Sequence, residues 1–292
     1  MIGRQLKSKP AGFWIALGAP FVLLALVFSG CATSADSSQP YLILYAFEEE
    51  GELIRDNMSS ITAEQLLGRE VARGRLSGKD IVLAELGIGM NNAAMTAQKM
   101  LDVYRPKAVI VSGIAGSIDT SVHIGDIVVC DSWIVHDYGY VGRDGFIPYG
   151  IEVVLPGSDS LSTVEGFDVD SALIHVVEAI DVASLSLSGV ADRAPQIRVR
   201  GVGVSGNAFI DSEEKRLWLS DRFAALITDM ESAAVAQVCA VNDVPFIAFR
   251  AASDLAGGSG SETARAELNE FLRVAADNSS SVVMKYVEIL SE

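Results

Sequence analysis

The stretch Val244-Pro245-Phe246-Ile247-Ala248-Phe249-Arg250-Ala251-Ala252-Ser253-Asp254 runs from apolar residues into a carboxylate. The apolar part is typical of a buried strand, and Asp254 then lies where that strand gives way to a loop. A second segment, Asp229-Met230-Glu231-Ser232, follows a short apolar run and opens an alanine-rich helical stretch. Open α/β sheets bind ligands beyond the carboxyl ends of their strands. The two segments therefore predict a ligand site at one edge of a sheet.

Acidic residues at these positions also have a simpler interpretation as helix caps, which stabilise the amino ends of helices. A third acidic cluster, Glu48-Glu49-Glu50, follows the first expected strand at 41–46. Carboxylates beside a core cost free energy unless they are paired or used. The three clusters together favour a functional site over three independent caps.

Three carboxylates at strand ends can supply the acid and the base of a hydrolysis, and cleavage of an N-glycosidic bond is one reaction that would use all three. The bond breaks through a cationic sugar, which a nearby carboxylate stabilises. A purine departs more easily when a carboxylic acid protonates it, and another carboxylate can deprotonate the attacking water. This chemistry needs neither cofactor nor metal, and no Cys/His spacing in the chain resembles a metal site. We therefore expect no cofactor and no metal.

Strand and helix patterns alternate along the chain, which predicts one α/β domain. Expected strands cover 41–46, 81–86, 108–111, 124–130, 197–204, 226–228 and 244–249. Expected helices run from the acidic triplet through Arg55 and over 91–104, 173–183, 231–241 and 268–290. Glycine turns are expected at 87–89 and 112–116. The buried contexts of Cys130 and Cys239 favour free thiols over a disulfide.

Two further stretches have patterns that bear on function. Residues 201–206 match the pattern G-x-G-x-x-G, but the glycines fall inside an expected strand and do not open a helix. A dinucleotide site is therefore disfavoured. Two interpretations are preferred: an edge strand, or a strand whose end lines a ligand site in which Phe209 stacks on the ligand. The long segment 138–170 is rich in Gly, Pro and aromatic residues. Such segments usually serve as lids or subunit contacts.

Residues 1–30 are predicted to export the chain. Basic residues come first, an apolar run occupies 13–28, and Ser29-Gly30-Cys31 follows. This order is typical of a secretory signal, and the last residues resemble the lipobox of bacterial lipoproteins, with Cys31 as the lipidated residue. The alternative is an uncleaved membrane anchor, because the apolar run approaches the length of a membrane span. We expect a lipid-anchored protein of the bacterial cell envelope, facing the periplasm.

The part of the chain beyond this predicted signal is strongly acidic. The net charge is −16, and −19 remains without residues 1–30, because these carry three positive and no negative charges. A protein with this much negative charge is a poor partner for nucleic acid or an anionic membrane. We therefore expect it to contact the membrane only through the N-terminal lipid. The small polar residues between Cys31 and position 40 predict a flexible tether. The folded body is expected at 41–292.

With these segments in view, residues 41–290 resemble the 5′-methylthioadenosine/S-adenosylhomocysteine nucleosidases of the nucleoside phosphorylase superfamily. The resemblance is carried by the acidic clusters above and by three further segments: Ser112-Gly113-Ile114-Ala115-Gly116, Ile124-Gly125-Asp126-Ile127-Val128-Val129 and Val204-Ser205-Gly206-Asn207-Ala208-Phe209-Ile210. It implies a three-layer α/β fold with a central mixed, twisted sheet flanked by helices. It also implies a small purine nucleoside as substrate.

The resemblance also implies roles for individual residues. Glu50 would activate water, and Asp254 would protonate purine N7 with support from Ser253. Glu231 would hold the ribose hydroxyls. The remaining substrate-binding positions are Met230 against the sugar, Phe209 stacked on the base, Ile210 at the base edge through its backbone, and Ile114.

The chain departs from the family pattern at several of these positions. Ile114 stands where the nucleosidases usually carry a small hydroxyl residue, Asp229 replaces a usual Glu, and Ser117 replaces a usual Gly. About four extra residues lie between Asp254 and the segment that begins at Leu268. These differences leave the range of substrates open.

The phosphorylase branch holds phosphate with arginines, whereas here the first loop is acidic and no Arg lies between Lys107 and Ser121. We therefore expect hydrolysis of adenine nucleosides. Phosphorolysis is one alternative, and a non-catalytic nucleoside-binding or storage-type lipoprotein is the other. The family also implies a homodimer or higher oligomer in which a neighbour completes the 5′ pocket, with 138–170 as the expected contact.

Overall fold

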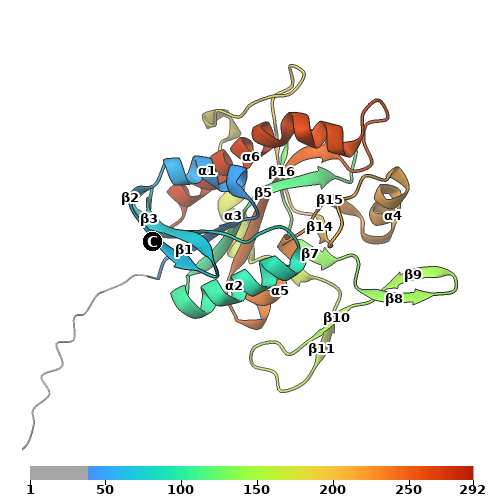
Figure 1. The fold of residues 1–292 in the computed structure, drawn as a ribbon, viewed down its shortest axis with the longest axis horizontal. Coiled ribbons are helices and arrows are strands. Elements are labelled where there is room, and N and C mark those ends of the chain that lie inside the picture. Colours follow the sequence, from blue (N-terminus) through green and yellow to red (C-terminus); the bar gives the residue numbers. More distant parts are fainter. Residues whose placement is uncertain (1–38, 292) are drawn as a thin grey trace, which may run out of the picture. The chain divides into compact units, whose positions relative to one another are not determined.

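The computed structural model describes residues 39–291, which form a layered α/β body around one large mixed sheet (Figure 1). No helix in this range is long and apolar enough to cross a membrane. The predicted signal, lipobox and most of the tether lie outside the described residues. The helices are α1 (Glu48–Asp56), α2 (Met90–Tyr104), α3 (Ser171–Glu178), the 3-10 turn η1 (Val182–Ser184), α4 (Glu213–Phe223), α5 (Ser232–Val241) and α6 (Ala264–Ile289).

The sheet has twelve strands within the described range. Its members, in chain order, are β1 (Tyr41–Tyr45), β2 (Ser59–Leu66), β3 (Arg69–Leu76), β4 (Lys79–Glu85), β5 (Ala108–Ser117), β6 (Ile127–Val129), β7 (Ser132–Val135), β12 (Phe167–Asp168), β13 (Ile197–Val199), β14 (Val202–Ser205), β15 (Ala225–Asp229) and β16 (Phe246–Leu255). The main path runs β12-β7-β14-β15-β5-β1-β4-β3-β2, and β16, β6 and β13 branch from β5. Parallel and antiparallel pairs both occur, so the sheet is mixed as expected.

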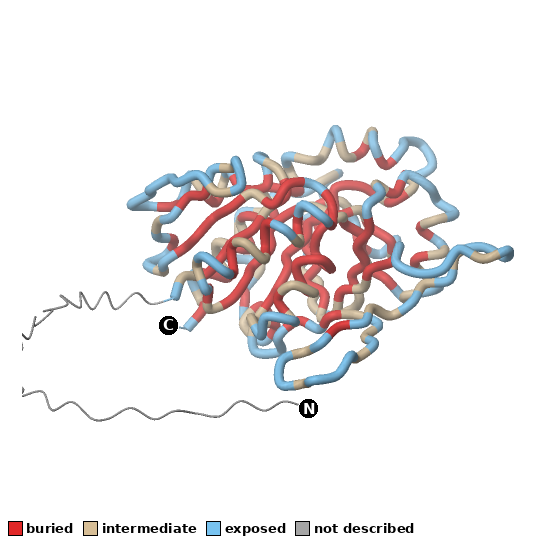
Figure 2. The backbone as a smooth tube through the Cα atoms, turned by 60° about the horizontal axis from the view of Figure 1, so that its bottom comes forward, coloured by how far each residue is buried: buried red, intermediate tan, exposed pale blue. Residues whose placement is uncertain are grey.

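Helices cover both faces of this sheet. Helices α1 and α6 lie on one face and pack on each other, while α2 and α5 lie on the other (Figure 1). The apolar strands β1, β5 and β16 are buried on both sides, as their continuous apolar sequences predict. Figure 2 shows the buried residues gathered in the interior of the body and the exposed residues at its periphery. The three-layer architecture implied by the resemblance is confirmed.

The two central strands are longer than the sequence predicted. β5 was expected to end at Val111 in a glycine turn, and β16 at Phe249, but the two pair in parallel as far as Ser117 and Leu255. The glycine segment 112–116 is therefore strand, and the turn prediction is wrong. Glycine is needed there for close approach, because a Cβ at Gly113 would collide with side-chain atoms of Arg250 and Glu50. The turn at 87–89 is confirmed, with positive φ at both glycines.

Other differences have local causes. The hairpin β2–β3 was not predicted, since β2 is exposed except at its last residue and shows no alternation. The expected strand 197–204 divides into β13 and β14 because Arg200 and Gly201 adopt positive φ between them. Helix α4 was also missed, and α6 begins before residue 268. The thiols of Cys130 and Cys239 are buried and free, as expected.

Most of the segment 138–170 projects from the body as two hairpins, and its last part returns to the large sheet as β12. These are β8 (Gly139–Gly142) with β9 (Gly145–Pro148), and β10 (Ile151–Val153) with β11 (Ser162–Val164). Figure 1 shows both beyond the edge of the large sheet. Several large apolar side chains on them are exposed, including Val141 at 77%. A hairpin with such side chains in solvent has the character of a contact surface.

Candidate active site

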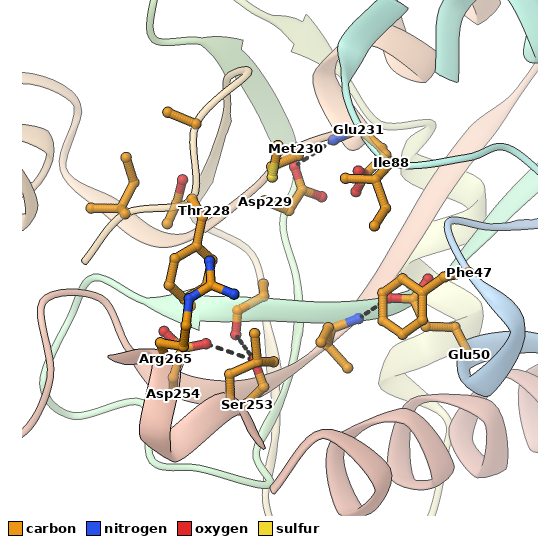
Figure 3. A pocket seen from close by; sticks show the side chains of 17 residues that line it. Phe47, Glu50, Ile88, Thr228, Asp229, Met230, Glu231, Ser253, Asp254 and Arg265 are labelled. Atoms are coloured by element: carbon orange, nitrogen blue, oxygen red, sulfur yellow. Dashed lines mark hydrogen bonds between the residues drawn. The ribbon is translucent and has the colours of Figure 1, made fainter. Parts of the chain in front are cut away.

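A cavity of about 350 Å³ lies at the carboxyl ends of β5, β15 and β16. All eight residues that the sequence assigned to catalysis or substrate binding line it: Glu50, Ile114, Phe209, Ile210, Met230, Glu231, Ser253 and Asp254. Figure 3 shows Ser253 and Asp254 at one end, Phe47 and Glu50 at the other, and Met230 and Glu231 along the wall between them. Segments more than 200 residues apart in the chain thus form one site.

A buried arginine organises the Glu50 end of the cavity. Arg250 has no exposed surface, and its Nε lies 2.7 Å from Asp229 Oδ2. Its Nη2 lies 3.3 Å from Glu231 Oε2, and its Nη1 lies 3.7 Å from Glu50 Oε1. A buried guanidinium must be surrounded by acceptors, because an unpaired charge in the interior is very costly. Three carboxylates meet this need and are fixed by it.

Each carboxylate comes from a different element and has its own backbone anchor. Glu50, in the first turn of α1, accepts hydrogen bonds from Ala46 N at 2.6 Å and from Ile114 N at 2.8 Å. Glu231 accepts one from Gly89 N at 2.9 Å, at the amino end of α2. Asp229 ends β15 and accepts bonds from Ser232 N and from the Ser205 hydroxyl. Strand ends and helix starts thereby converge on one point.

Burial controls the protonation of Glu50 and Glu231. It raises the pKa of Glu50 to about 7, against the positive charge of Arg250, which lowers it, while Glu231 adds a smaller upward effect. Burial likewise raises the pKa of Glu231, opposed by Arg250. A carboxyl group with a pKa near 7 exchanges its proton readily at neutral pH. Glu50 is thus poised to act as a base.

Asp254 lies in a different environment at the opposite end. Burial raises its pKa to about 7, and no cation is among the causes. The Ser253 hydroxyl lies 2.7 Å from Asp254 Oδ2 and donates to it, which opposes the rise. Asp254 Oδ1 is buried and has no hydrogen-bond partner among the described residues. A protonated carboxyl that lines a cavity and has one oxygen without a partner can act as an acid toward a bound molecule.

The wall next to Asp254 is aromatic and apolar. Phe209 and Ile210 line it, and the Ile210 carbonyl accepts a hydrogen bond from Gly257 N at 3.2 Å. The guanidinium of Arg265 lies 5.0 Å from the centroid of the Phe209 ring. Such a surface suits a flat heterocycle, which gains stacking on a ring and polar contacts at its edge.

Several residues that line the cavity or lie directly behind its wall were not foreseen from the sequence. Arg250 reads there as the end of an apolar run, although a charged residue inside a buried strand is itself a signal for buried partners. Phe47, Ile88 and Arg265 line the cavity itself. Their positions follow from long-range packing, which local patterns do not report. Within residues 39–291, no group of three or more His, Cys, Asp or Glu side chains is arranged to hold a metal ion.

Comparisons with known proteins agree with this geometry. Residues 40–288 match the family model described as Phosphorylase superfamily. The 5′-methylthioadenosine/S-adenosylhomocysteine nucleosidase of Bacillus thuringiensis subsp. konkukian is 31% identical over 249 residues, covering 85% of this chain and 98% of the relative.

Two solved structures are also similar. The nucleosidase of that name from Neisseria meningitidis, in complex with methylthio-immucillin-A, is 28% identical with a TM-score of 0.70, over 87% of this chain and all of that one. The futalosine hydrolase of Helicobacter pylori is 26% identical with a TM-score of 0.70, over 86% of this chain and 98% of that one.

Replacing Arg250 by Met should destabilise the protein by about 3–5 kcal/mol at pH 8, because three buried carboxylates lose their partner. The loss should shrink as the pH falls. The pKa values of Glu50 and Glu231 are already raised, so the folded variant takes up protons before the unfolded chain does, and stability rises toward acid pH. Urea unfolding followed by circular dichroism at pH 8 and pH 6 measures both effects.

Arg273→Met is the matched control. Arg273 is 52% exposed and pairs with Glu52 and Asp277, so its loss should cost less than about 1 kcal/mol. Equal losses in the two variants, or an Arg250→Met loss that does not change with pH, would contradict the account of the cluster.

Proposed function

The chain belongs to the phosphorylase superfamily and, within it, to the 5′-methylthioadenosine/S-adenosylhomocysteine nucleosidases, and we propose that it hydrolyses the N-glycosidic bond of adenine nucleosides. Methylthioadenosine and S-adenosylhomocysteine are the proposed substrates, since the relatives are named for them. The observation that carries the proposal is the pair of carboxyl groups, Glu50 and Asp254, at opposite ends of one cavity with pKa values near 7.

Asp254 acts on the base in this mechanism. Its free Oδ1 donates a proton to purine N7 as the glycosidic bond breaks, so that the base leaves neutral. Ser253 fixes the other oxygen of the carboxyl group. Phe209 stacks on the purine, and the backbone of Ile210 contacts its edge. Protonation by a group with a pKa near 7 is efficient at neutral pH.

The sugar lies between the two ends. Glu231 holds the 2′ and 3′ hydroxyls and Met230 packs against the ring, while Ile114 lies beside it. The charge of Glu231 also stabilises the developing sugar cation. Glu50 takes a proton from water as the water attacks the anomeric carbon. Arg250 contacts both Glu231 and Glu50. It therefore fixes the position of Glu50, the general base, relative to Glu231, which binds the sugar.

The charges around Glu50 favour water over phosphate as the nucleophile. Arg250 is shared among three carboxylates, so this end of the cavity has more negative than positive charge. Arg265, which lines the cavity, lies at the Phe209 end. A phosphate near Glu50 would meet repulsion without a free cation to bind it.

Chromatography of products tests this proposal. Purified residues 32–292 are incubated with methylthioadenosine, S-adenosylhomocysteine, adenosine and inosine, with and without phosphate. Adenine should be released without phosphate, and Asp254→Asn should reduce its release by about 10²–10⁴-fold because the purine loses its acid. The variant should keep the unfolding midpoint of the wild type within a few degrees.

Other results identify the alternatives. Release only in the presence of phosphate would indicate a phosphorylase. Binding of adenosine without any product would indicate a nucleoside-binding lipoprotein that has lost turnover. Full activity of Asp254→Asn would remove Asp254 from its role as the acid.

We further propose that residues 1–30 are a lipoprotein signal, that Cys31 carries the lipid, and that the body is held at a bacterial membrane facing the periplasm. The support is the basic, apolar and Ser29-Gly30-Cys31 order. In cells fed labelled palmitate, the full chain should incorporate label and Cys31→Ser should not. Cys239→Ser, at a buried thiol, should remain labelled. Label in Cys31→Ser would contradict this assignment.

We also propose that the body is a homodimer or higher homo-oligomer whose contact includes the β8–β9 hairpin. The support is the exposure of Tyr140 and Val141 on that hairpin. Sedimentation velocity should show an oligomer that Tyr140→Asp dissociates. Leu217→Asp, at an equally exposed position on α4, should leave it intact. A fully active wild-type monomer would contradict the proposal.

A further inference from the structure

The residue that follows Asp254 is held by a buried carboxylate on α6. Glu267 is 6% exposed, and its Oε2 accepts a hydrogen bond from Leu255 N at 2.9 Å. Its Oε1 accepts another from Ser259 N at 3.1 Å. Both oxygens of Glu267 thus bind the backbone of the loop that leaves β16. The loop begins after Leu255, the neighbour of Asp254, so Glu267 holds the backbone directly beside the acid.

A second carboxylate lies on the other side of the same loop. Asp211 precedes α4, and its Oδ1 accepts a hydrogen bond from Ala264 N at 2.9 Å, at the start of α6. The loop 256–263 is therefore tied at both ends by carboxylates, at Leu255 before it and Ala264 after it. Both negative charges act on Asp254, whose pKa burial raises most, with Glu267 and then Asp211 adding to the rise.

The other charges around Asp254 do not cancel these two. From α6, Arg265 lines the cavity, but its side chain is exposed and solvent screens it. Asp229 on β15 and Arg250 on β16 pair with each other. From β5, Gly116 and Ser117 adjoin Asp254 and carry no charge. Among the described residues, the charges closest to the acid are thus predominantly negative.

We propose that Glu267 is a positioning residue for the acid: it fastens the loop at Leu255 and places a fixed negative charge beside Asp254, so that Asp254 keeps its proton until the purine accepts it. The inference deepens the proposed function and rests on Asp254 being the acid. Asp211 assists from the other side of the loop. A negative neighbour favours the neutral form of a carboxylic acid, which is the form that donates.

The variant Glu267→Gln tests the charge while keeping the shape and one acceptor oxygen. The pH dependence of kcat/KM for methylthioadenosine is measured from pH 5 to 9. Activity falls on the alkaline side of the profile because Asp254 loses its proton there. Without the negative charge of Glu267, Asp254 should lose its proton at lower pH, and the fall in activity should move to lower pH with it. We expect about a fivefold loss at pH 8 and less than about a twofold change at pH 6, since one pKa unit is tenfold.

Glu270→Gln is the matched control, because Glu270 lies one turn further along α6, is exposed and changes the net charge equally. Its profile should coincide with that of the wild type. A Glu267→Gln loss by the same factor at every pH would show that Glu267 only supports the loop, and would overturn the proposal. An unchanged alkaline limb would do so as well.

A titration without substrate separates this inference from the proposed function. The carboxyl signal of Asp254 is followed by NMR in protein labelled with ¹³C-aspartate and assigned with Asp254→Asn. A lower pKa of Asp254 in the Glu267→Gln variant supports the inference, whether or not a nucleoside is cleaved. A failure to cleave any nucleoside would count against the proposed function alone. An unchanged pKa in an active enzyme overturns the inference and leaves the function standing.

Discussion

The structure depends on the neutralisation of one buried cation. Arg250 stands in the middle of a central strand with no access to water, and the fold is tenable only because Asp229, Glu231 and Glu50 reach it from three elements. This requirement places the first turn of α1, the end of β15 and the start of α5 at one point. It also explains Gly113, where any side chain would collide with Arg250. The carboxylates that neutralise Arg250 in the core are therefore the same groups that form this end of the site.

Arg250 acts on only one of the two carboxyl groups whose pKa lies near 7, which gives them different chemistry. Burial raises the pKa of both Glu50 and Asp254 to about 7, yet their surroundings differ. Glu50 contacts Arg250 and two backbone N–H groups, which favour its ionised form. Asp254 has the Ser253 hydroxyl and the negative charges of neighbouring carboxylates. Pairs of groups whose surroundings favour opposite protonation states supply the acid and the base of a reaction.

The positions of the site residues were easier to predict from the sequence than the strands and long-range contacts that bring them together. Carboxylates after apolar runs located the three acidic clusters, because the end of a buried strand is a local feature. The family resemblance then selected Glu50 and Glu231 within their clusters. The extension of β5 and β16 was not predictable, since glycines that permit close approach look the same as glycines that turn. Nor was the role of Arg250, which depends on three partners distant in the chain. The exposed strand β2 has no periodic pattern to detect.

The central claim is that Glu50, held by Arg250, activates the water that attacks the sugar. The most direct measurement is the rate of adenine release from methylthioadenosine by Glu50→Gln at pH 7, without phosphate, together with its affinity for adenine. The account predicts a rate at least about 10²-fold below that of the wild type, because Glu50→Gln removes the general base that activates water. The affinity for adenine should stay unchanged, because the residues that bind the purine are intact. A variant that releases adenine at the wild-type rate would contradict it.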